Sequence, residues 1–227
     1  MSQSHLQRAV GWALSAALSL ACCLSAHAGT LVAQVKDRNG NPVQNAVIYA
    51  IAVGGGGSVA PASAAAVVEQ QAYKFEPYVS IVQKGTRMRF PNKDQTEHHL
   101  KTLSGPSAFE FKVYTRKEPD ATVMDKVGLV SLQCLIHDWM SAHIYVVDTP
   151  WFGKTNRTGS AVVEGVPVGE YDVYVTHPSV LIPSQVTPSG PRRVKLDATN
   201  VQVIEAKLEL VPKAEPTRRY PPPNSYQ

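Results

Sequence analysis

The sequence predicts an all-β protein. Short runs of alternating polar and apolar residues recur along the chain. In residues 86–90, for example, Met88 and Phe90 would point inward and Arg87 and Arg89 outward. The 227 residues include 15 glycines and 17 prolines, which favour turns, and no stretch carries the period of an amphipathic helix. The hydrophobic content of 44% is ordinary for a globular protein.

The first 28 residues have the composition of an export signal. Arg8 gives a short positive segment, residues 9–25 are nearly all apolar or small, and Ala-His-Ala at 26–28 matches the small-residue cleavage pattern. We therefore expect cleavage before Gly29 and a periplasmic mature protein. No later stretch is long enough to span a bilayer, so no membrane span is expected.

The cysteine count changes once this signal is removed. Cys22 and Cys23 leave with it, and the residues before them depart from the lipoprotein pattern, so a lipid anchor is not expected. Cys134 then remains alone, and no internal disulfide can form. A lone thiol in an oxidising compartment is at risk of oxidation unless it is buried or bound to a metal.

Cys134 also begins the most informative motif of the chain, C-x2-H-x2-M, which continues with His137 and Met140. Two His and one Cys in a plane, with a long axial bond to Met, define a type 1 (blue) copper site that transfers electrons. The fourth ligand must be a His from elsewhere, and His98 and His99 are the candidates. The alternative is a buried Cys that ends a strand, with His and Met as ordinary packing residues.

Strand alternation separates the two candidate histidines. His98 shares a face with Leu100, and His99 shares a face with Lys101. A site buried at one end of a sandwich would therefore take His98. Further along, His143 is expected in a strand with its ring toward solvent.

The other predicted strands follow in order. Residues 31–35 and 46–51 read as a hairpin around an Asn-Gly turn at 37–43. Residues 54–66 form a Gly-, Ala- and Ser-rich linker, and residues 212–227 form a Pro-rich tail that is expected to be disordered. Between them, strands are expected at 79–82, 86–90, 109–114, 127–134 and 144–147, twice within 158–175, and at 192–196 and 201–210.

Residues 67–148 resemble a cupredoxin of the plastocyanin and amicyanin family. The resemblance rests on Phe-Glu-Pro at 75–77, Lys-Gly at 84–85, Phe-Pro-Asn-Lys-Asp at 90–94, His-His-Leu at 98–100, and the C-x2-H-x2-M loop, which has the amicyanin spacing. It implies a Greek-key β-sandwich with one copper ion held by His98, Cys134, His137 and Met140. In this family an Asn after the first ligand ties the two ligand loops together. Here His99 stands in its place, so an imidazole N–H would have to supply that bond, and His99 is also the alternative ligand.

The same resemblance implies where electrons enter and leave. In the family the edge of the loop His is the electron port, and apolar surface surrounds it. Leu135, Ile136 and Trp139 flank His137 and form the candidate docking patch. The alternative is that these three side chains pack in the core.

Residues 29–53 and 149–211 resemble the two halves of a carboxypeptidase-regulatory-like (transthyretin-like) β-sandwich. The cues are V-x-D-x-x-G-x-P-V-x-x-A-V from Val35 and P-x-G-x-Y from Pro167. The predicted fold is therefore a cupredoxin β-sandwich inserted in, or joined to, a second β-sandwich. The alternative is two consecutive modules with a separate N-terminal hairpin. The arrangement as a whole resembles the exported "methylamine utilization protein"-like group.

Together these features predict a periplasmic type 1 copper protein that carries single electrons between periplasmic redox proteins. Four protein ligands would leave copper no open position for a substrate, so an enzyme is not expected. The formal net charge of +4, with no long cationic run, makes nucleic acid an unexpected partner. The alternatives are a copper-handling protein without a redox partner and a structural or carbohydrate-binding β-sandwich.

Overall fold

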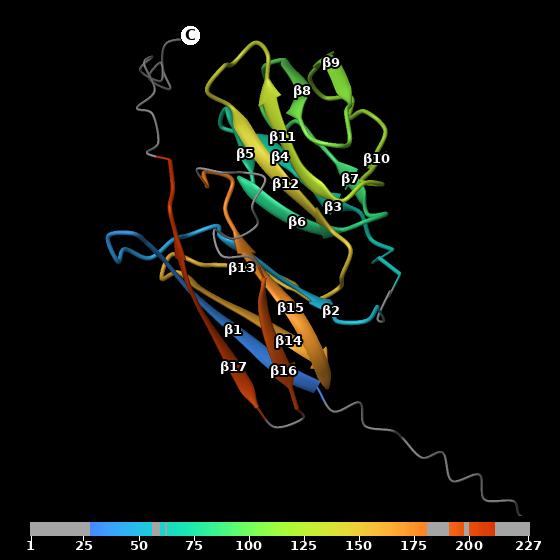
Figure 1. Ribbon diagram of the computed structural model, residues 1–227. Helices are drawn as coiled ribbons and strands as arrows, with labels where there is room; N and C mark the ends of the chain where they lie inside the picture. Colours follow the sequence, from blue (N-terminus) through green and yellow to red (C-terminus); the bar gives the residue numbers. More distant parts are fainter. Residues whose placement is uncertain (1–27, 56–59, 62, 181–190, 198–199, 212–227) are drawn as a thin grey trace, which may run out of the picture.

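The structure, a computed structural model, describes residues 28–55, 60–61, 63–180, 191–197 and 200–211. These residues form the strands β1 to β17 and no helix, which confirms the all-β prediction (Figure 1). Within this part of the chain, no helix exists that is long and apolar enough to cross a membrane. Apart from Ala28, the predicted export signal lies outside the described residues, and so does the predicted Pro-rich tail.

Seven strands form two sheets that share one apolar core. Their orders are β14-β1-β17 and β13-β2-β15-β16. Their bounds are β1 Ala28–Asp37, β2 Val47–Ala52, β13 Phe152–Lys154, β14 Ser160–Pro167, β15 Gly169–Thr176, β16 Arg192–Leu196 and β17 Val201–Leu208. Leu31, Ile48 and Tyr171 are buried between the two sheets. Segments from before residue 53 and after residue 151 thus lie side by side in this lower group of strands (Figure 1).

The predicted hairpin between the first two long strands is wrong, because β1 and β2 lie in different sheets. The turn after β1 does form: the Asp37 carboxylate accepts hydrogen bonds from the N–H groups of Asn39 and Asn41, both at 2.8 Å. Beyond it, the buried Thr155 hydroxyl donates to the Val43 carbonyl at 2.7 Å and accepts from the Ala46 N–H at 2.8 Å. These bonds satisfy the backbone where the chain crosses from one sheet to the other.

The remaining strands form the upper group in Figure 1. A five-stranded sheet of order β6-β12-β11-β8-β9 shares its core with a smaller sheet of order β10-β7-β3, and β4 and β5 form a short ribbon. The bounds are β3 Ala66–Val67, β4 Glu69–Gln71, β5 Lys74–Glu76, β6 Val79–Gln83, β7 Arg87–Arg89, β8 His98–Ser104, β9 Glu110–Tyr114, β10 Thr122–Val123, β11 Gly128–Cys134 and β12 Ser141–Val147. Met88 and Phe90 are buried while Arg87 and Arg89 are exposed, as the alternation predicts.

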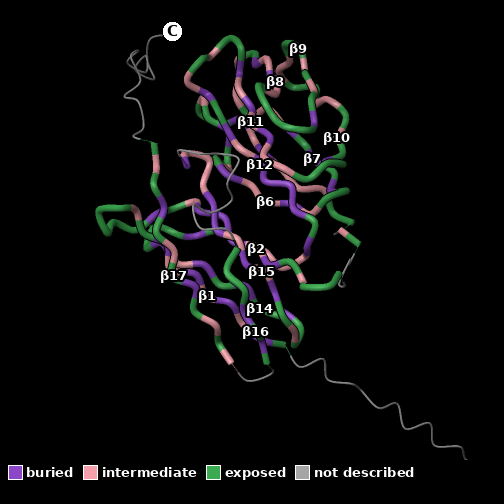
Figure 2. Tube along the Cα trace, in the orientation of Figure 1, coloured by how far each residue is buried: buried purple, intermediate pink, exposed green. Residues whose placement is uncertain are grey.

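From Ile144 to Val147, β12 is buried on both of its faces, and the two groups of strands touch there (Figure 2). Ala142, Ile144 and Val146 enter the upper core, while Tyr145 packs with Val79 and with Val47 of the lower group. The expectation that His143 faces solvent is wrong for the same reason. Its ring shares the Tyr145 face, lies 5.2 Å from the Tyr78 ring centroid, and bonds the Ser131 hydroxyl through Nδ1 at 3.1 Å.

Candidate metal centre

The candidate site lies where two neighbouring strands and one loop meet. His98 is the first residue of β8, and Cys134 is the last residue of the adjacent β11, where it pairs with Leu100. The side chains of both residues are fully buried. His137 comes from the loop that follows β11, and it is partly buried. Strand pairing therefore joins a residue from far upstream to the C-x2-H-x2-M loop.

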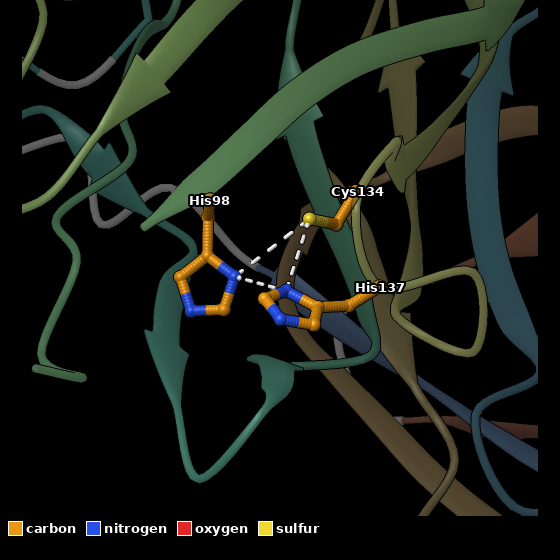
Figure 3. Close-up of side chains that lie close together, drawn as sticks. All are labelled: His98, Cys134 and His137. Carbon is orange, nitrogen blue, oxygen red and sulfur yellow. Dashed lines mark hydrogen bonds between the residues drawn. The ribbon is translucent and has the colours of Figure 1, made fainter. Parts of the chain in front are cut away.

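Three potential ligand atoms converge at this point (Figure 3). The Nδ1 atoms of His98 and His137 lie 3.1 Å apart. The Cys134 Sγ atom lies 3.5 Å from His137 Nδ1 and 3.7 Å from His98 Nδ1. All three atoms lie within 4.8 Å of one another, a grouping that suits one metal ion.

The loop between Cys134 and Met140 is closed by its own backbone. The Cys134 N–H donates to the Met140 carbonyl at 3.1 Å, and the Met140 N–H donates to the His137 carbonyl at 2.9 Å. The Met140 side chain is 1% exposed and belongs to the same apolar core as Cys134. The loop thus brings all three sequence-predicted donors of the motif to one end of the upper core.

The surroundings of Cys134 favour its thiolate. Burial alone would raise the pKa of the thiol, but the contact with His98 and hydrogen bonds from the backbone N–H groups of His99, Ile136 and His137 lower it below its usual value. The thiolate is the form of cysteine that binds metals. Burial lowers the pKa of His137, and the nearby His98 lowers it further, which favours the neutral imidazole that a metal requires.

His98 is held from its other side by a carboxylate. His98 Nε2 lies 2.9 Å from Asp94 Oδ2. Burial lowers the pKa of His98, but the bonds with Cys134 and Asp94 outweigh it and raise the pKa above its ordinary value. From the sequence, Asp94 is identified only as part of the segment Phe-Pro-Asn-Lys-Asp at 90–94, with no role at the site. A carboxylate four residues before a candidate ligand is the signal that could have identified it.

His99 contacts the site through its backbone. Its ring Nε2 lies 2.7 Å from Glu110 Oε1, on the side away from the buried donors. Its carbonyl accepts the Leu135 N–H at 2.8 Å, and its N–H bonds the Cys134 sulfur. The tie between the two ligand segments, expected from the imidazole, is therefore made by main-chain atoms.

The surface beside the site is apolar and aromatic. Leu135 is 45% exposed and Ile136 48% exposed, whereas Trp139 is partly buried against the upper core. Sequence reasoning missed a further aromatic residue, Tyr73, which lies in the turn between β4 and β5. The centroid of its ring lies 5.1 Å from that of His137, edge to face, and 6.5 Å from that of Trp139.

No protein-family model matches the chain, and no curated protein sequence gives a significant match. Among solved structures, a Cu-containing nitrite reductase from Thermus scotoductus SA-01 is 24% identical, with a TM-score of 0.36. The match covers 43% of this chain but spans only 25% of the reductase. An amicyanin in the Cu(I) state is 18% identical over 44% of this chain and 99% of its own, with a TM-score of 0.34.

A purple cupredoxin from Nitrosopumilus maritimus is 16% identical over 36% of this chain and 99% of its own, with a TM-score of 0.33. Each of these likenesses covers less than half of the chain. TM-scores this low do not support the transfer of a function from these structures to this protein. The geometry of the site is the evidence for its function.

Proposed function

We propose that this protein is a type 1 copper protein that carries single electrons between redox partners. The observation that supports this most directly is the convergence of His98 Nδ1, His137 Nδ1 and Cys134 Sγ at one buried point. Two imidazole nitrogens and one thiolate are the equatorial donors of such a site. Met140, buried on the same loop, would supply a fourth, weaker sulfur donor.

The donors suit a soft, redox-active ion. Two imidazole nitrogens facing each other at 3.1 Å would repel through their lone pairs unless a proton or a cation lies between them. The thiolate beside them favours a cation with affinity for sulfur, and imidazole with thiolate and thioether suits copper better than it suits Mg²⁺ or Ca²⁺. When bound, copper would supply a one-electron redox couple.

The chain's own contribution is to hold the donors still and to keep water away. Cys134 and His98 are fully buried, and backbone bonds close the loop that carries His137 and Met140. A preset arrangement of ligands reduces the rearrangement that accompanies a change of charge. With all four positions filled by protein, no site would be left for a substrate, which favours electron transfer over catalysis at the metal.

The exposed side of the loop would be the contact surface for redox proteins. Leu135 and Ile136 expose nearly half of their surface beside His137, whose ring is only partly buried. Small apolar surfaces of this kind suit brief encounters between electron-transfer proteins. The export signal expected at residues 1–28 would place these partners in the periplasm.

The decisive experiment is an optical spectrum of the mature protein loaded with Cu(II). We expect a strong visible band from thiolate-to-copper charge transfer, and a one-electron potential measurable by titration. Cys134→Ser should abolish the band, because an alcohol cannot donate as a thiolate does. The matched control is Ser131→Ala, on the same strand but directed toward His143 instead of the site. A wild-type protein that binds copper but stays colourless would favour metal handling over electron transfer.

A further inference from the structure

One side chain touches both the candidate ligand His98 and a separate, strained turn. Asp94 Oδ2 lies 2.9 Å from His98 Nε2 and accepts the Tyr73 N–H at 3.1 Å, while its Oδ1 accepts the Ala72 N–H at 2.7 Å. The Asp94 side chain is only 12% exposed. We propose that Asp94 is a positioning residue that presents His98 to the metal and at the same time holds Tyr73 against the ligand His137.

The first half of this role concerns the tautomer of His98. An ionised carboxylate has only acceptor atoms, so the hydrogen in the contact must belong to His98 Nε2. In the neutral ring, Nδ1 then carries the lone pair, and Nδ1 is the atom that faces Cys134 and His137. Carboxylates that bond the far nitrogen of a ligand histidine fix its tautomer and make it a better donor.

Asp94 is itself held in place. Its N–H donates to Asn92 Oδ1 at 2.9 Å, and Asn92 Nδ2 donates to the carbonyls of Thr96 and Tyr114 at 2.8 and 3.1 Å. Tyr114 pairs with His98 in the sheet. The carboxylate is therefore fixed relative to the strand that carries His98, which lets it act as a support for the ring.

The second half concerns the turn between β4 and β5. Ala72 and Tyr73 have φ values of 51° and 56°, in the left-handed region that residues with a side chain rarely occupy. Such a conformation costs roughly 1–2 kcal/mol per residue. The two N–H groups that this conformation turns toward Asp94 are bonded by its two oxygens, and bonds to an ionised acceptor are stronger than neutral ones.

The turn matters because it places the Tyr73 ring. Its centroid lies 5.1 Å from that of His137 and 6.0 Å from that of His98, edge to face in both cases. Asp94 thus connects the two candidate imidazole ligands: it bonds one directly and supports the aromatic ring that packs on the other. Because coupling between two sites is reciprocal, a metal that fixes His98 should also steady the turn.

The test compares wild type, Asp94→Ala and Asp94→Asn with the control Asp148→Asn, which removes an exposed carboxylate at the far end of β12. We expect Asp94→Ala to weaken Cu(II) binding by roughly 10- to 100-fold, with a smaller loss for Asp94→Asn, whose amide oxygen still accepts a hydrogen bond. The control should bind copper as wild type does. Equal affinities in wild type and Asp94→Ala would overturn the role of Asp94 at His98.

Two readouts do not need bound copper. Nitrogen NMR of the metal-free protein, at a pH high enough for the His98 ring to be neutral, should show His98 protonated at Nε2 in wild type and a mixture of tautomers in Asp94→Ala. Amide exchange at Ala72 and Tyr73 should be at least roughly tenfold faster in Asp94→Ala, because both N–H groups lose their acceptor. Unchanged exchange would overturn the role of Asp94 at the turn.

The copper part of this inference rests on the proposed function, and the two can fail separately. If wild type binds no copper, the proposed function fails, while the NMR tautomer and the amide exchange still decide what Asp94 positions. If wild type binds copper and gives the visible band but Asp94→Ala behaves identically in all three readouts, only the inference about Asp94 fails.

Discussion

His98 and His99 are adjacent in the sequence, yet they contact different parts of the molecule. The His98 side chain is fully buried beside Cys134, while the His99 ring turns outward to Glu110. Strand alternation is enough to separate them, since a period of two sends neighbours to opposite faces. The same alternation could not find Asp94 or Tyr73, because each reaches the site from a turn, where no period applies.

The two histidines should therefore differ in how much copper affinity each contributes. His98→Ala should lose more copper affinity than the roughly 10- to 100-fold that follows loss of an outer hydrogen-bond partner, because it removes a donor atom. His99→Ala should keep both copper and colour. It removes only an exposed pair with Glu110, worth about 0–1 kcal/mol, and leaves the main-chain bonds to Leu135 and Cys134 in place.

Isothermal titration with Cu(II) and visible spectra of both variants would check this. A His99→Ala protein that binds no copper, next to a His98→Ala protein that still turns blue, would reverse the assignment of the two histidines.

At the scale of strands, the sequence showed most of the long elements but not all of their partners. The turn after β1 was correctly placed by Asp37 and the Asn-Gly pair, yet β2 joins the opposite sheet. A tight turn read from local sequence favours a hairpin. The bonds that redirect the chain come from Thr155, more than a hundred positions away, so no local pattern contains them.

A polar cluster joins Tyr114 of β9 to Gln70 of β4 and to the carbonyl of Phe90, just after β7. Tyr114, paired with His98, donates its hydroxyl hydrogen to the Phe90 carbonyl at 2.8 Å and accepts from Gln70 Nε2 at 2.5 Å. Burial raises the pKa of Tyr114 to about 12, so the hydroxyl stays protonated and can donate. Gln70 is 0% exposed, and its Oε1 atom has no hydrogen-bond partner among the described residues.

Tyr114→Phe should therefore destabilise the fold. Removing the hydroxyl takes one hydrogen-bond partner from the Gln70 amide and one from the Phe90 carbonyl, which keep only their mutual bond at 3.3 Å. The loss of these two bonds should lower the free energy of unfolding by about 1–3 kcal/mol, at about 0.5–1.5 kcal/mol per bond. Urea denaturation of wild type and Tyr114→Phe would measure this difference in the free energy of unfolding. Tyr174→Phe, in the ring stack with Tyr49 in the lower group, is the control for losing a tyrosine hydroxyl. A Tyr114→Phe protein as stable as wild type would show that the cluster adds nothing to stability.

Across the molecule, the two groups of strands pack against each other through a shared apolar cluster. Val79 and Tyr145 of the upper group meet Val47 of the lower group, and Lys154 Nζ donates to the Val79 carbonyl at 2.6 Å. Burial lowers the pKa of Lys154, as expected for an amine partly removed from water. The sequence predicted a strand at 144–147, but the burial of its second face depends on packing against another group of strands, which the strand's own residues do not reveal.

His143 lies beside this interface, next to Tyr145 and Tyr78, and makes the stability of the fold sensitive to acid. Burial, with a smaller contribution from His177, lowers the pKa of His143 from 6.5 to about 4. Between these two values the unfolded chain binds the proton and the folded one does not, so the free energy of unfolding falls as the pH falls. This stability is complete above about pH 6.5 and is lost progressively down to about pH 4. A shift of this size corresponds to a change on the order of 3 kcal/mol.

His143→Gln removes this titration while keeping a polar side chain next to Ser131. Urea denaturation at several pH values from about 7 down to about 4 should give a shallower loss of stability for His143→Gln than for wild type. Comparing slopes removes the contributions of the histidines that do not interact with His143. His177 does interact with it, and its smaller contribution stays in the difference. Parallel curves for wild type and His143→Gln would mean that His143 is already protonated, or freely hydrated, in the folded protein.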